Sequence, residues 1–367
     1  MKPVLFVTNH VPPERVGAFA ALHRRVPLEL AIFGGRSTHA GADVADPGVP
    51  HRRVAQREIR TLAASGAYGA VVCGTAGRIA LPQAWLGARA GRTPFVLWSA
   101  LWAHPRTPAH IVGGAPLMAT LYRSADAVVA YGPHVAAFVR PRGARNVHIA
   151  PQAVDNAFWS RPVRAERRSA FTAVFLGRRS RAKGAAVLLD AWRRSGLRAP
   201  AAALVLAGVP PGIPRVRAGG AVALIGPQSP EQVRGLLASA DVLVIPSIRT
   251  RNFREPWGLV ANEAMNQSTP VIASDEVGAV AGGLVRHERN GLVVPAADPD
   301  ALAAALRRLH GDADLRSRLG DNARRDVAAY TFEAWAAGFA TALGSLRQRA
   351  VAPRIVAGSD HDTSSLR

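Results

Sequence analysis

Short apolar runs alternate with amphipathic stretches along most of the 367-residue chain. The first run, KPVLFVTNH, ends in polar residues, and the stretch RVGAFAALHRR behind it has the apolar spacing of a helix. The runs LELAIFGG, AVVCGT, FVLWSA and AVVAYG repeat the pattern, with helical stretches such as QREIRTLAAS and PLMATLYRSA between them. Nearly continuous apolar strands that alternate with helices indicate a parallel sheet covered on both faces.

The alternation pauses in a polar segment at residues 152–170 and then begins again. The second set of apolar runs is TAVFLGR, ALVLAGV, VALIGP, DVLVIPS, PVIASD and GLVVP. A chain of this length is too long for one ordinary core. We therefore expect an α/β protein with two doubly wound, Rossmann-like parallel sheets facing each other across a cleft, in domains at residues 1–160 and 165–335.

Helical patterns near the carboxyl terminus complete this picture. Helices are predicted at residues 300–310, 314–329 and 332–347. The part of the last helix beyond the second domain, residues 336–350, could return to the first domain. The tail at 351–367, which ends in GSDHDTSSLR, has no periodicity and is expected to be disordered.

The formal net charge of +21 invites nucleic acid or an anionic membrane as partner. Lysine occurs only at positions 2 and 183, so 44 of the 46 basic residues are arginine, as GC-rich coding would produce. The arginines are spread along the chain, and no RNP-type or helix-turn-helix pattern is evident. We therefore expect no specific nucleic-acid partner, while a peripheral contact with the inner face of a membrane stays compatible with the charge.

Three features favour a cytoplasmic protein. No apolar run is long enough to span a bilayer, and the first residues, MKPVLFVTNHVPP, read as a strand rather than a signal peptide. The single cysteine, Cys73, excludes an internal disulfide and a thiolate metal cluster. Because it lies in the apolar run AVVCG, a buried inert thiol is the expected state.

Ligands of open parallel sheets bind outside the carboxyl ends of the strands, so the loop in FLGRRSRAKGAAVLLDAW draws attention. Gly177 lets the chain leave the strand, and Arg178 and Lys183 bracket the loop. A guanidinium and an ammonium before a helix start suit a diphosphate. A solvated basic loop is the alternative, favoured for Arg179 and Arg181. The GxxxxGK(S/T) spacing of a Walker loop is absent.

The stretch REPWGLVANEAMN, residues 254–266, carries two acids eight positions apart behind the buried-looking strand VLVIPS. Pro256 disfavours helix at Glu255, which should lie in the loop, while Glu263 should lie on the helix that follows. The two carboxylates can accept hydrogen bonds from two sets of hydroxyls, with phosphate facing the N–H groups of Trp257, Gly258 and Leu259. A helix-dipole acid plus a surface acid is an equally supported interpretation on spacing alone.

Taken together, these segments resemble a known family. The run EPWGLVANEAM resembles the E-x7-E motif of retaining glycosyltransferases of the GT-B fold, in the large family 4. GRRSRAKG resembles that family's G-R-x(n)-K-G diphosphate clamp, and TPVIASDEVGAVAGGLVRHERNGLVVPAADPDALAAAL resembles the segment that follows. The matches come in the family's order over about residues 170–310, whereas the first half is similar only in rhythm. The segment VGAVAGGLV departs from the frequent Gly-Gly-acid pattern, which removes one donor-sugar contact from what the resemblance implies.

The resemblance implies a metal-independent enzyme that moves a sugar from a nucleoside-diphosphate sugar to a sugar-containing or lipid-linked acceptor, with no cofactor besides the donor. Arg178 and Lys183 would bind the diphosphate and help it leave. Glu255 would bind donor-sugar hydroxyls, and Glu263 would bind the ribose. The loop GPQS, which begins with Gly226 and Pro227, would lie near the base.

Other polar residues follow strands of the first half. His104 follows the strand FVLW and is a candidate catalytic residue lining the cleft, while His10 ends the first strand and is a weaker candidate for donor or acceptor binding. His134 begins a later helix, where a structural role is favoured. For the tryptophans that flank His104, Trp98 and Trp102, apolar packing is the default, with stacking on an acceptor sugar as the alternative. Arg15 is interpreted as a solvated side chain, with binding of an acidic acceptor as the alternative.

Three Asp-x-Asp pairs could suggest a metal-dependent transferase instead. Asp298 reads as a helix cap, Asp312 lies in a turn between helices, and Asp360 lies in the tail. None of these pairs closes a strand, so no metal role is assigned.

Two other classes stay open: a nucleotide-sugar epimerase or phosphorylase on the same scaffold, and a non-catalytic basic binding protein. A phosphorylase would need a pyridoxal-bearing lysine, but the only internal lysine is already assigned to the diphosphate loop. A non-catalytic binding protein would give Glu255 and Glu263 no functional role.

Overall fold

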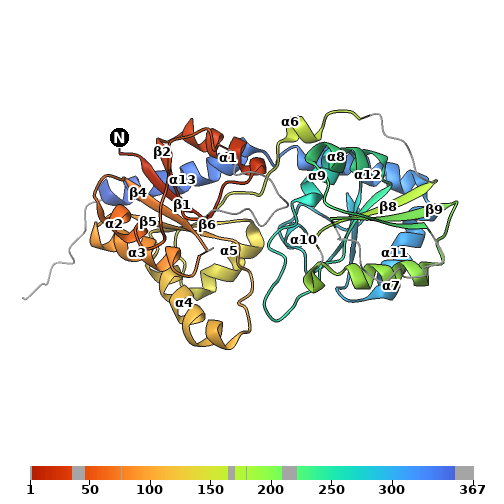
Figure 1. Ribbon diagram of the computed structural model, residues 1–367, viewed down its shortest axis with the longest axis horizontal. Coiled ribbons are helices and arrows are strands. Elements are labelled where there is room, and N and C mark those ends of the chain that lie inside the picture. The colour runs from red at the N-terminus through yellow and green to blue at the C-terminus, as the bar shows by residue number, and fades with distance from the viewer. Residues whose placement is uncertain are drawn as a thin grey trace, which may run out of the picture.

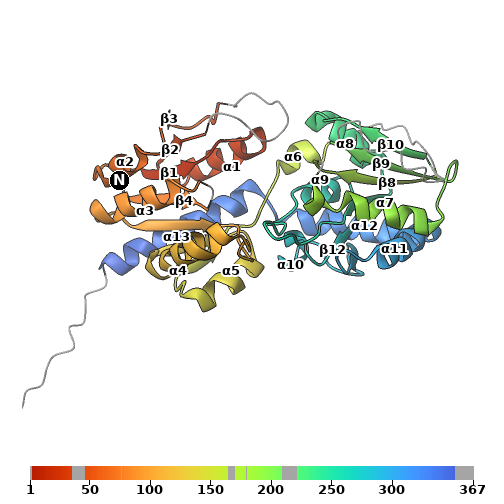
Figure 2. The same cartoon turned by 60° about the horizontal axis from the view of Figure 1, so that its bottom comes forward.

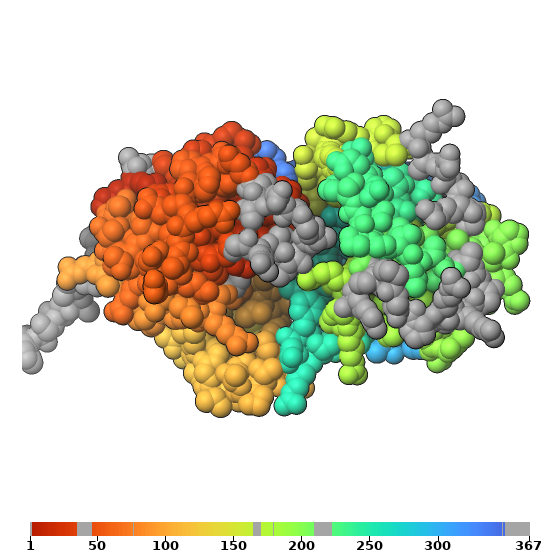
Figure 3. Space-filling model, in the orientation of Figure 1, coloured from red at the N-terminus to blue at the C-terminus, as the bar shows by residue number. Residues whose placement is uncertain are grey.

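The protein folds into two α/β halves that lie side by side, as the computed structural model shows (Figure 1). The structure describes residues 2–34, 46–75, 77–163, 170–178, 180–208 and 221–351. Each half contains one parallel sheet with helices against its faces, and the halves meet along one side of each (Figure 3). The expected fold class, two doubly wound parallel sheets, is confirmed. The tail predicted to be disordered lies, apart from Val351, outside the described residues.

The first half is built on a seven-stranded sheet in the order β3-β2-β1-β4-β5-β6-β7. Its strands are β1 (Val4–Thr8), β2 (Leu28–Ile32), β3 (His51–Arg53), β4 (Ala70–Gly74), β5 (Phe95–Ser99), β6 (Ala127–Ala130) and β7 (Val147–Ile149). Its helices are α1 (Pro13–His23), α2 (Ile59–Ala64), α3 (Ala80–Ala90), α4 (Ala115–Ser124) and α5 (Pro133–Val139), with shorter turns at His110–Gly114 and Arg140–Arg142. The order reverses between β1 and β4, which opens a crevice at their carboxyl ends.

The second half is built on a six-stranded sheet in the order β10-β9-β8-β11-β12-β13. Its strands are β8 (Phe171–Leu176), β9 (Ala202–Ala207), β10 (Ala221–Ile225), β11 (Val242–Ile245), β12 (Val271–Ser274) and β13 (Gly291–Val294). Its helices are α7 (Ala185–Ser195), α8 (Pro230–Ser239), α9 (Val260–Asn266), α10 (Gly278–Ala281), α11 (Pro299–Gly311) and α12 (Ala313–Val327), and α6 (Asn156–Trp159) connects the halves. Here the order reverses between β8 and β11, so the loops after these two strands lie next to each other.

The final helix, α13 (Phe332–Val351), packs on the first sheet although it follows α12 of the second half (Figure 2). Trp335 and Phe339 are fully buried against Phe6, Phe19 and Trp98. The ring centroids of these side chains lie 4.5–6.5 Å apart, in tilted and edge-to-face arrangements that stabilise aromatic clusters. The chain thus crosses between the halves twice, and its last helix completes the core of the first.

Two expectations about individual residues are confirmed in the described part of the chain. The Asp298 carboxylate caps α11 by accepting hydrogen bonds from the backbone N–H groups of Asp300 and Ala301. Asp312 caps α12 in the same way, and the Asp360 pair lies outside the described residues. Cys73 is buried in β4, and burial raises the pKa of its thiol.

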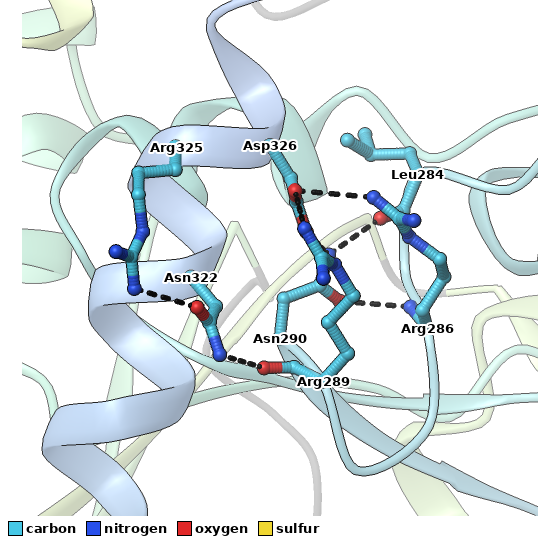
Figure 4. A network of polar contacts seen from close by, with 7 residues as sticks. All are labelled: Leu284, Arg286, Arg289, Asn290, Asn322, Arg325 and Asp326. Carbon is cyan, nitrogen blue, oxygen red and sulfur yellow. Dashed lines mark hydrogen bonds and ion pairs between the residues drawn. The ribbon is translucent and has the colours of Figure 1, made fainter.

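The loop before β13 is anchored to α12 by the carboxylate of Asp326 (Figure 4). Asp326 pairs with the guanidinium groups of Arg286 and Arg289 at 3.1 and 2.7 Å and accepts a hydrogen bond of 2.8 Å from Asn290 Nδ2. Asn290 is fully buried and also donates to the Leu284 carbonyl. The Arg289 guanidinium is the main cause that lowers the pKa of Asp326. The network fixes a segment that would otherwise be a solvated loop.

We expect Asp326→Asn to destabilise the protein by about 1–2 kcal/mol at pH 7. Because the folded-state pKa is lowered, this stabilisation is complete above the ordinary pKa of about 4 and disappears as pH falls through the folded value. Urea unfolding at pH 7 and at stepwise lower pH measures the difference. Asp321→Asn, an exposed position on the same helix, is the control. Equal losses in the two variants, or a loss that grows on acidification, would contradict the role of the network.

Candidate functional site

A cavity of about 680 Å³ lies between the two halves. On one side it is bounded by the carboxyl ends of β1 and β4, where the strand order reverses, and by the segment that follows β5. On the other side lies the loop between β11 and α9. Its charged and titratable lining comprises His10, Glu14, Arg15, His104 and Tyr131 from the first half and Arg249 and Arg254 from the second.

A partly buried ion pair lies at the carboxyl edge of the second sheet. Lys183 Nζ lies 2.6 Å from Glu255 Oε2, and the Ser247 hydroxyl donates to the same oxygen at 3.2 Å. Lys183 ends a short 3-10 turn after β8, and Glu255 lies in the loop after β11. Only 6% of Glu255 is exposed. A carboxylate this far from water needs a counter-charge, and the adjacency of β8 and β11 brings that charge within reach.

Gly184 permits this approach. It adopts φ +73° directly after Lys183, and a Cβ at this position would overlap the Pro246 carbonyl. The same two loops are tied by a 2.8 Å hydrogen bond from the Ile248 N–H to the Ala182 carbonyl. A larger residue at Gly184 would therefore force the lysine loop away from the acid.

Residues of the first half hold the main chain around Glu255. The Glu255 carbonyl accepts a hydrogen bond of 3.0 Å from Trp102 Nε1, and the Arg254 guanidinium lies 3.3 Å from the centre of the Trp102 ring. His134 Nε2 donates to the Pro256 carbonyl at 3.1 Å. Burial lowers the pKa of His134 to about 4, so the imidazole is neutral at pH 7 and its role is that of a donor. The acid is thus positioned by both halves at once.

Glu263 occupies a different environment on α9. Its side chain is half-buried, and within the described residues its carboxylate has no hydrogen-bond partner. Burial raises its pKa to about 8, with the negative charge of Glu14 on α1 as a second cause. At neutral pH it is therefore largely protonated and able both to donate to and to accept from a hydroxyl.

The histidines take separate positions. His104 lines the cavity and its Nδ1 lies 3.0 Å from Nε2 of His110. Burial, together with His110 and Arg142, lowers the pKa of His104 to about 4. His10 lines the same cavity at the end of β1, whereas His134 is absent from the lining and serves the contact with Pro256.

The interpretation of Arg15 as a solvated side chain is wrong. Its guanidinium donates to Oε1 of the fully buried Gln152, lies 5.9 Å from the centre of the Trp98 ring and lines the cavity. Trp98 packs in the aromatic core as expected and also borders the cavity. Trp102 is 9% exposed, but its indole N–H makes a specific contact that packing alone would not require.

Of the remaining candidate residues, two line this cavity and the others do not. Pro256 and Leu259 line it, whereas its lining includes none of Gly177, Arg178, Lys183, Gly226, Pro227, Trp257, Gly258, Glu255 and Glu263. Arg178 is exposed at the end of β8, and Gly226 and Pro227 follow the edge strand β10. The Trp257 ring is buried and its Nε1 donates to Asn262 Oδ1 at 2.8 Å. Among the described residues, no carbonyl accepts a hydrogen bond from the N–H groups of residues 257–259.

Several residues around the site carry no signal in the sequence strong enough to single them out. Ser247 and Arg254 flank the recognised acid, and Gln152 and Asn262 join the halves through a 3.1 Å hydrogen bond from Asn262 Nδ2 to the Gln152 carbonyl. Glu14 is a first-turn acid of α1 whose negative charge acts on Glu263 in the other half. Each of these residues acts on a group that its own local sequence pattern does not identify.

Comparison with known proteins adds independent information about both halves. Residues 160–326 match the family described as Glycosyl transferases group 1. The uncharacterized glycosyltransferase MJ1607 of Methanocaldococcus jannaschii is 37% identical over 106 residues, which cover 29% of this chain and 25% of that protein. A D-inositol 3-phosphate glycosyltransferase of Jonesia denitrificans is 33% identical over 215 residues, covering 51% and 48%. The chain therefore spans between a quarter and about half of the length of these relatives.

Solved structures match over nearly the whole chain. Anabaena Alr3699/HepE, in complex with UDP and glucose, superposes with a TM-score of 0.72 at 18% identity, covering 94% of this chain and 100% of that one. Sucrose-phosphate synthase from Thermosynechococcus elongatus superposes with a TM-score of 0.65 at 21% identity, covering 95% and 99%. At these identities the likeness establishes the fold.

We expect Trp102→Phe to lower the free energy of unfolding by about 0.5–1.5 kcal/mol more than Trp85→Phe. Both changes shorten an indole ring, but the buried N–H of Trp85 has no acceptor in the described part of the chain, whereas that of Trp102 joins the halves through the Glu255 carbonyl. Urea unfolding of the two variants measures the difference. Equal losses would show that the hydrogen bond between the halves contributes nothing to stability.

Proposed function

We propose that this chain, whose residues 160–326 match the group 1 glycosyltransferase family, transfers a sugar from a nucleoside-diphosphate sugar to an acceptor hydroxyl. In this proposal residues 1–160 form the acceptor side and residues 165–335 bind the donor. The transfer retains the configuration of the sugar carbon and needs no metal ion.

The observation that carries the proposal is the Lys183–Glu255 pair. A diphosphate brings negative charges that compete with Glu255 for Lys183, and Arg178 stands on the same loop to share them. Once the lysine turns to the phosphates, the buried carboxylate needs new partners, and hydroxyls of the donor sugar supply them. Donor binding is thus an exchange of one set of paired charges for another, which limits the desolvation cost.

The other parts of the donor, namely its phosphates, ribose and base, are assigned to residues near the carboxyl ends of the strands. The N–H groups of residues 257–259 are suited to the phosphate oxygens, whereas the Gly177 N–H already donates to the Ala207 carbonyl at 3.1 Å. Glu263, with its raised pKa, is suited to the ribose hydroxyls, and Gly226 with Pro227 lies where the base would sit. UDP is the nucleotide that we favour, because structural neighbours of the same fold are complexes with UDP and with UDP-glucose.

Catalysis in this arrangement relies on position and electrostatics. As the bond from the sugar carbon to the diphosphate oxygen breaks, Lys183 and Arg178 stabilise the negative charge on the leaving group. The acceptor attacks from the same face, and its proton passes to an oxygen of the departing diphosphate. His104, neutral at pH 7, lines the cavity where the sugar and the acceptor would meet, and His10 lines the same cavity.

The acceptor side is the cavity wall formed by the first half, and a sugar-containing or lipid-linked acceptor is proposed there. No helix in the described part of the chain has the length and apolar character to cross a membrane. A location in the cytoplasm, at the inner face of the membrane when the acceptor is lipid-linked, is part of the proposal.

We expect UDP to raise the thermal midpoint of unfolding more than GDP or ADP does. At a UDP concentration 100 times its Kd, the stabilisation of the folded protein should be about 2.7 kcal/mol. Lys183→Met should abolish this shift, and Glu255→Gln should lower kcat for transfer from the preferred labelled nucleotide sugar by about 10²–10³. Arg181→Met, an exposed change in the same loop, is the control for both. No nucleotide shift in the parent protein, or full transfer by Glu255→Gln, would refute the assignment; an epimerised sugar without transfer would identify an epimerase.

We also expect transfer to persist in EDTA, because Lys183 and Arg178 supply the positive charge that a metal ion would otherwise bring to the diphosphate. Rates are compared before and after exhaustive dialysis against the chelator. Loss of transfer that Mg²⁺ or Mn²⁺ restores would overturn the metal-independent mechanism.

A further inference from the structure

A second cavity, of about 430 Å³, opens beside the first. The segment 102–105 and the side chains of Arg249 and Arg254 line both cavities. The outer wall of the second cavity comes from the turn His110–Gly114, α4, α5 and the turn that follows α5. It is therefore a side chamber of the interdomain cavity, placed on the acceptor side.

The lining of this chamber is strongly basic. It contains four arginines and two histidines and no aspartate or glutamate: Arg106, Arg142, Arg249, Arg254, His104 and His110. Arg254 is paired with Glu276, but among the described residues no carboxylate pairs with Arg106, Arg142 or Arg249. All three arginines are exposed, so solvent weakens the repulsion between them, and an anion that bound between them would gain several charge-assisted hydrogen bonds.

Parts of the chamber are already held in place. Arg142 donates to the Phe138 carbonyl at 2.6 Å and lies 3.7 Å from the centre of the Phe138 ring. The Arg106 backbone N–H donates to the Arg251 carbonyl at 2.7 Å, which joins the two walls of the chamber. His104 and His110 are bonded to each other at 3.0 Å. An anion entering here meets donors whose positions are fixed in part before binding.

We propose that this basic chamber, formed by Arg106, Arg142 and Arg249 with His104 and His110, binds a phosphate group of the acceptor and so directs an acceptor hydroxyl into the interdomain cavity. The inference rests on the proposed function and adds the substrate class, a phosphorylated acceptor. Lys183 and Glu255 line neither cavity, so the chamber is separate from the place assigned to the donor diphosphate.

The same chemistry has two sources, a soluble phosphate ester and a phospholipid headgroup. Ile111, in the chamber's outer wall, and Val112, which follows it in the same turn, are 60% and 80% exposed. They precede α4, which lies at the lower edge of the first half in Figure 1. Exposed apolar side chains beside a phosphate subsite would suit a lipid-linked acceptor, and the two sources can be separated by experiment.

The test uses the full chain with the donor half saturated by the nucleoside diphosphate that gives the largest thermal shift, so that binding at Lys183 is blocked. Glycerol 3-phosphate is titrated by calorimetry, and co-sedimentation is measured with phosphatidylcholine vesicles with and without phosphatidate. We expect one or both phosphate sources to bind, and Arg142→Gln/Arg249→Gln to weaken that binding by about tenfold or more. Arg60→Gln, an exposed arginine of α2, should leave it unchanged.

Ile111→Ser/Val112→Ser separates the two sources, because it should weaken vesicle binding and leave glycerol 3-phosphate binding intact. Retained nucleotide shifts in every variant show that the fold and the donor half are intact. A parent protein that binds nucleotide but neither phosphate source would overturn the subsite alone, whereas absence of the nucleotide shift would count against the proposed function. Equal losses in Arg60→Gln and the double variant would also overturn the subsite, since they indicate general charge attraction.

Discussion

The organisation of the site depends on one buried carboxylate. Glu255 is almost entirely removed from water, and an ionised acid in that position is tolerated only with a counter-charge and hydrogen bonds. Lys183 and Ser247 supply both, and they reach the acid because β8 and β11 are neighbours where the strand order of the second sheet reverses. The ion pair therefore follows from topology: two loops far apart in the chain leave the same edge of one sheet.

The first half contributes to the same acid through its main chain. Trp102 donates to the Glu255 carbonyl, His134 donates to the next carbonyl, and Arg254 stacks on the Trp102 ring. These contacts make the shape of the loop after β11 a property of the closed pair of halves rather than of the second half alone. Two of these residues, Trp102 and Arg254, also line both the interdomain cavity and the basic chamber. In the proposed function, the loop that positions Glu255 for the donor would also border the space that receives the acceptor.

Much of this arrangement could be predicted from local patterns. The alternation of apolar runs and helices predicts both sheets, and Pro256 places Glu255 in a loop and Glu263 on a helix, as observed. Gly184 and Lys183 stand where a strand-loop-helix pattern puts them. By contrast, no residue near Arg15 in the sequence predicts its hydrogen bond to Gln152. Likewise, no residue near Glu263 predicts that Glu14 raises its pKa. The solvated interpretation of Arg15 failed because its acceptor comes from a distant segment.

The sequence by itself determined the periodicities, the loop positions of the charged residues and the glycines that let those loops turn, since each depends on neighbours a few residues away. The tertiary structure alone decided which charges meet. Burial of Glu255, the raised pKa of Glu263, the donor role of Trp102 and the clustering of arginines around one chamber all require segments from both halves to come together. The physical reason is that desolvation and pairing depend on everything that surrounds a group, whereas periodicity records only which face of its own helix or strand is covered.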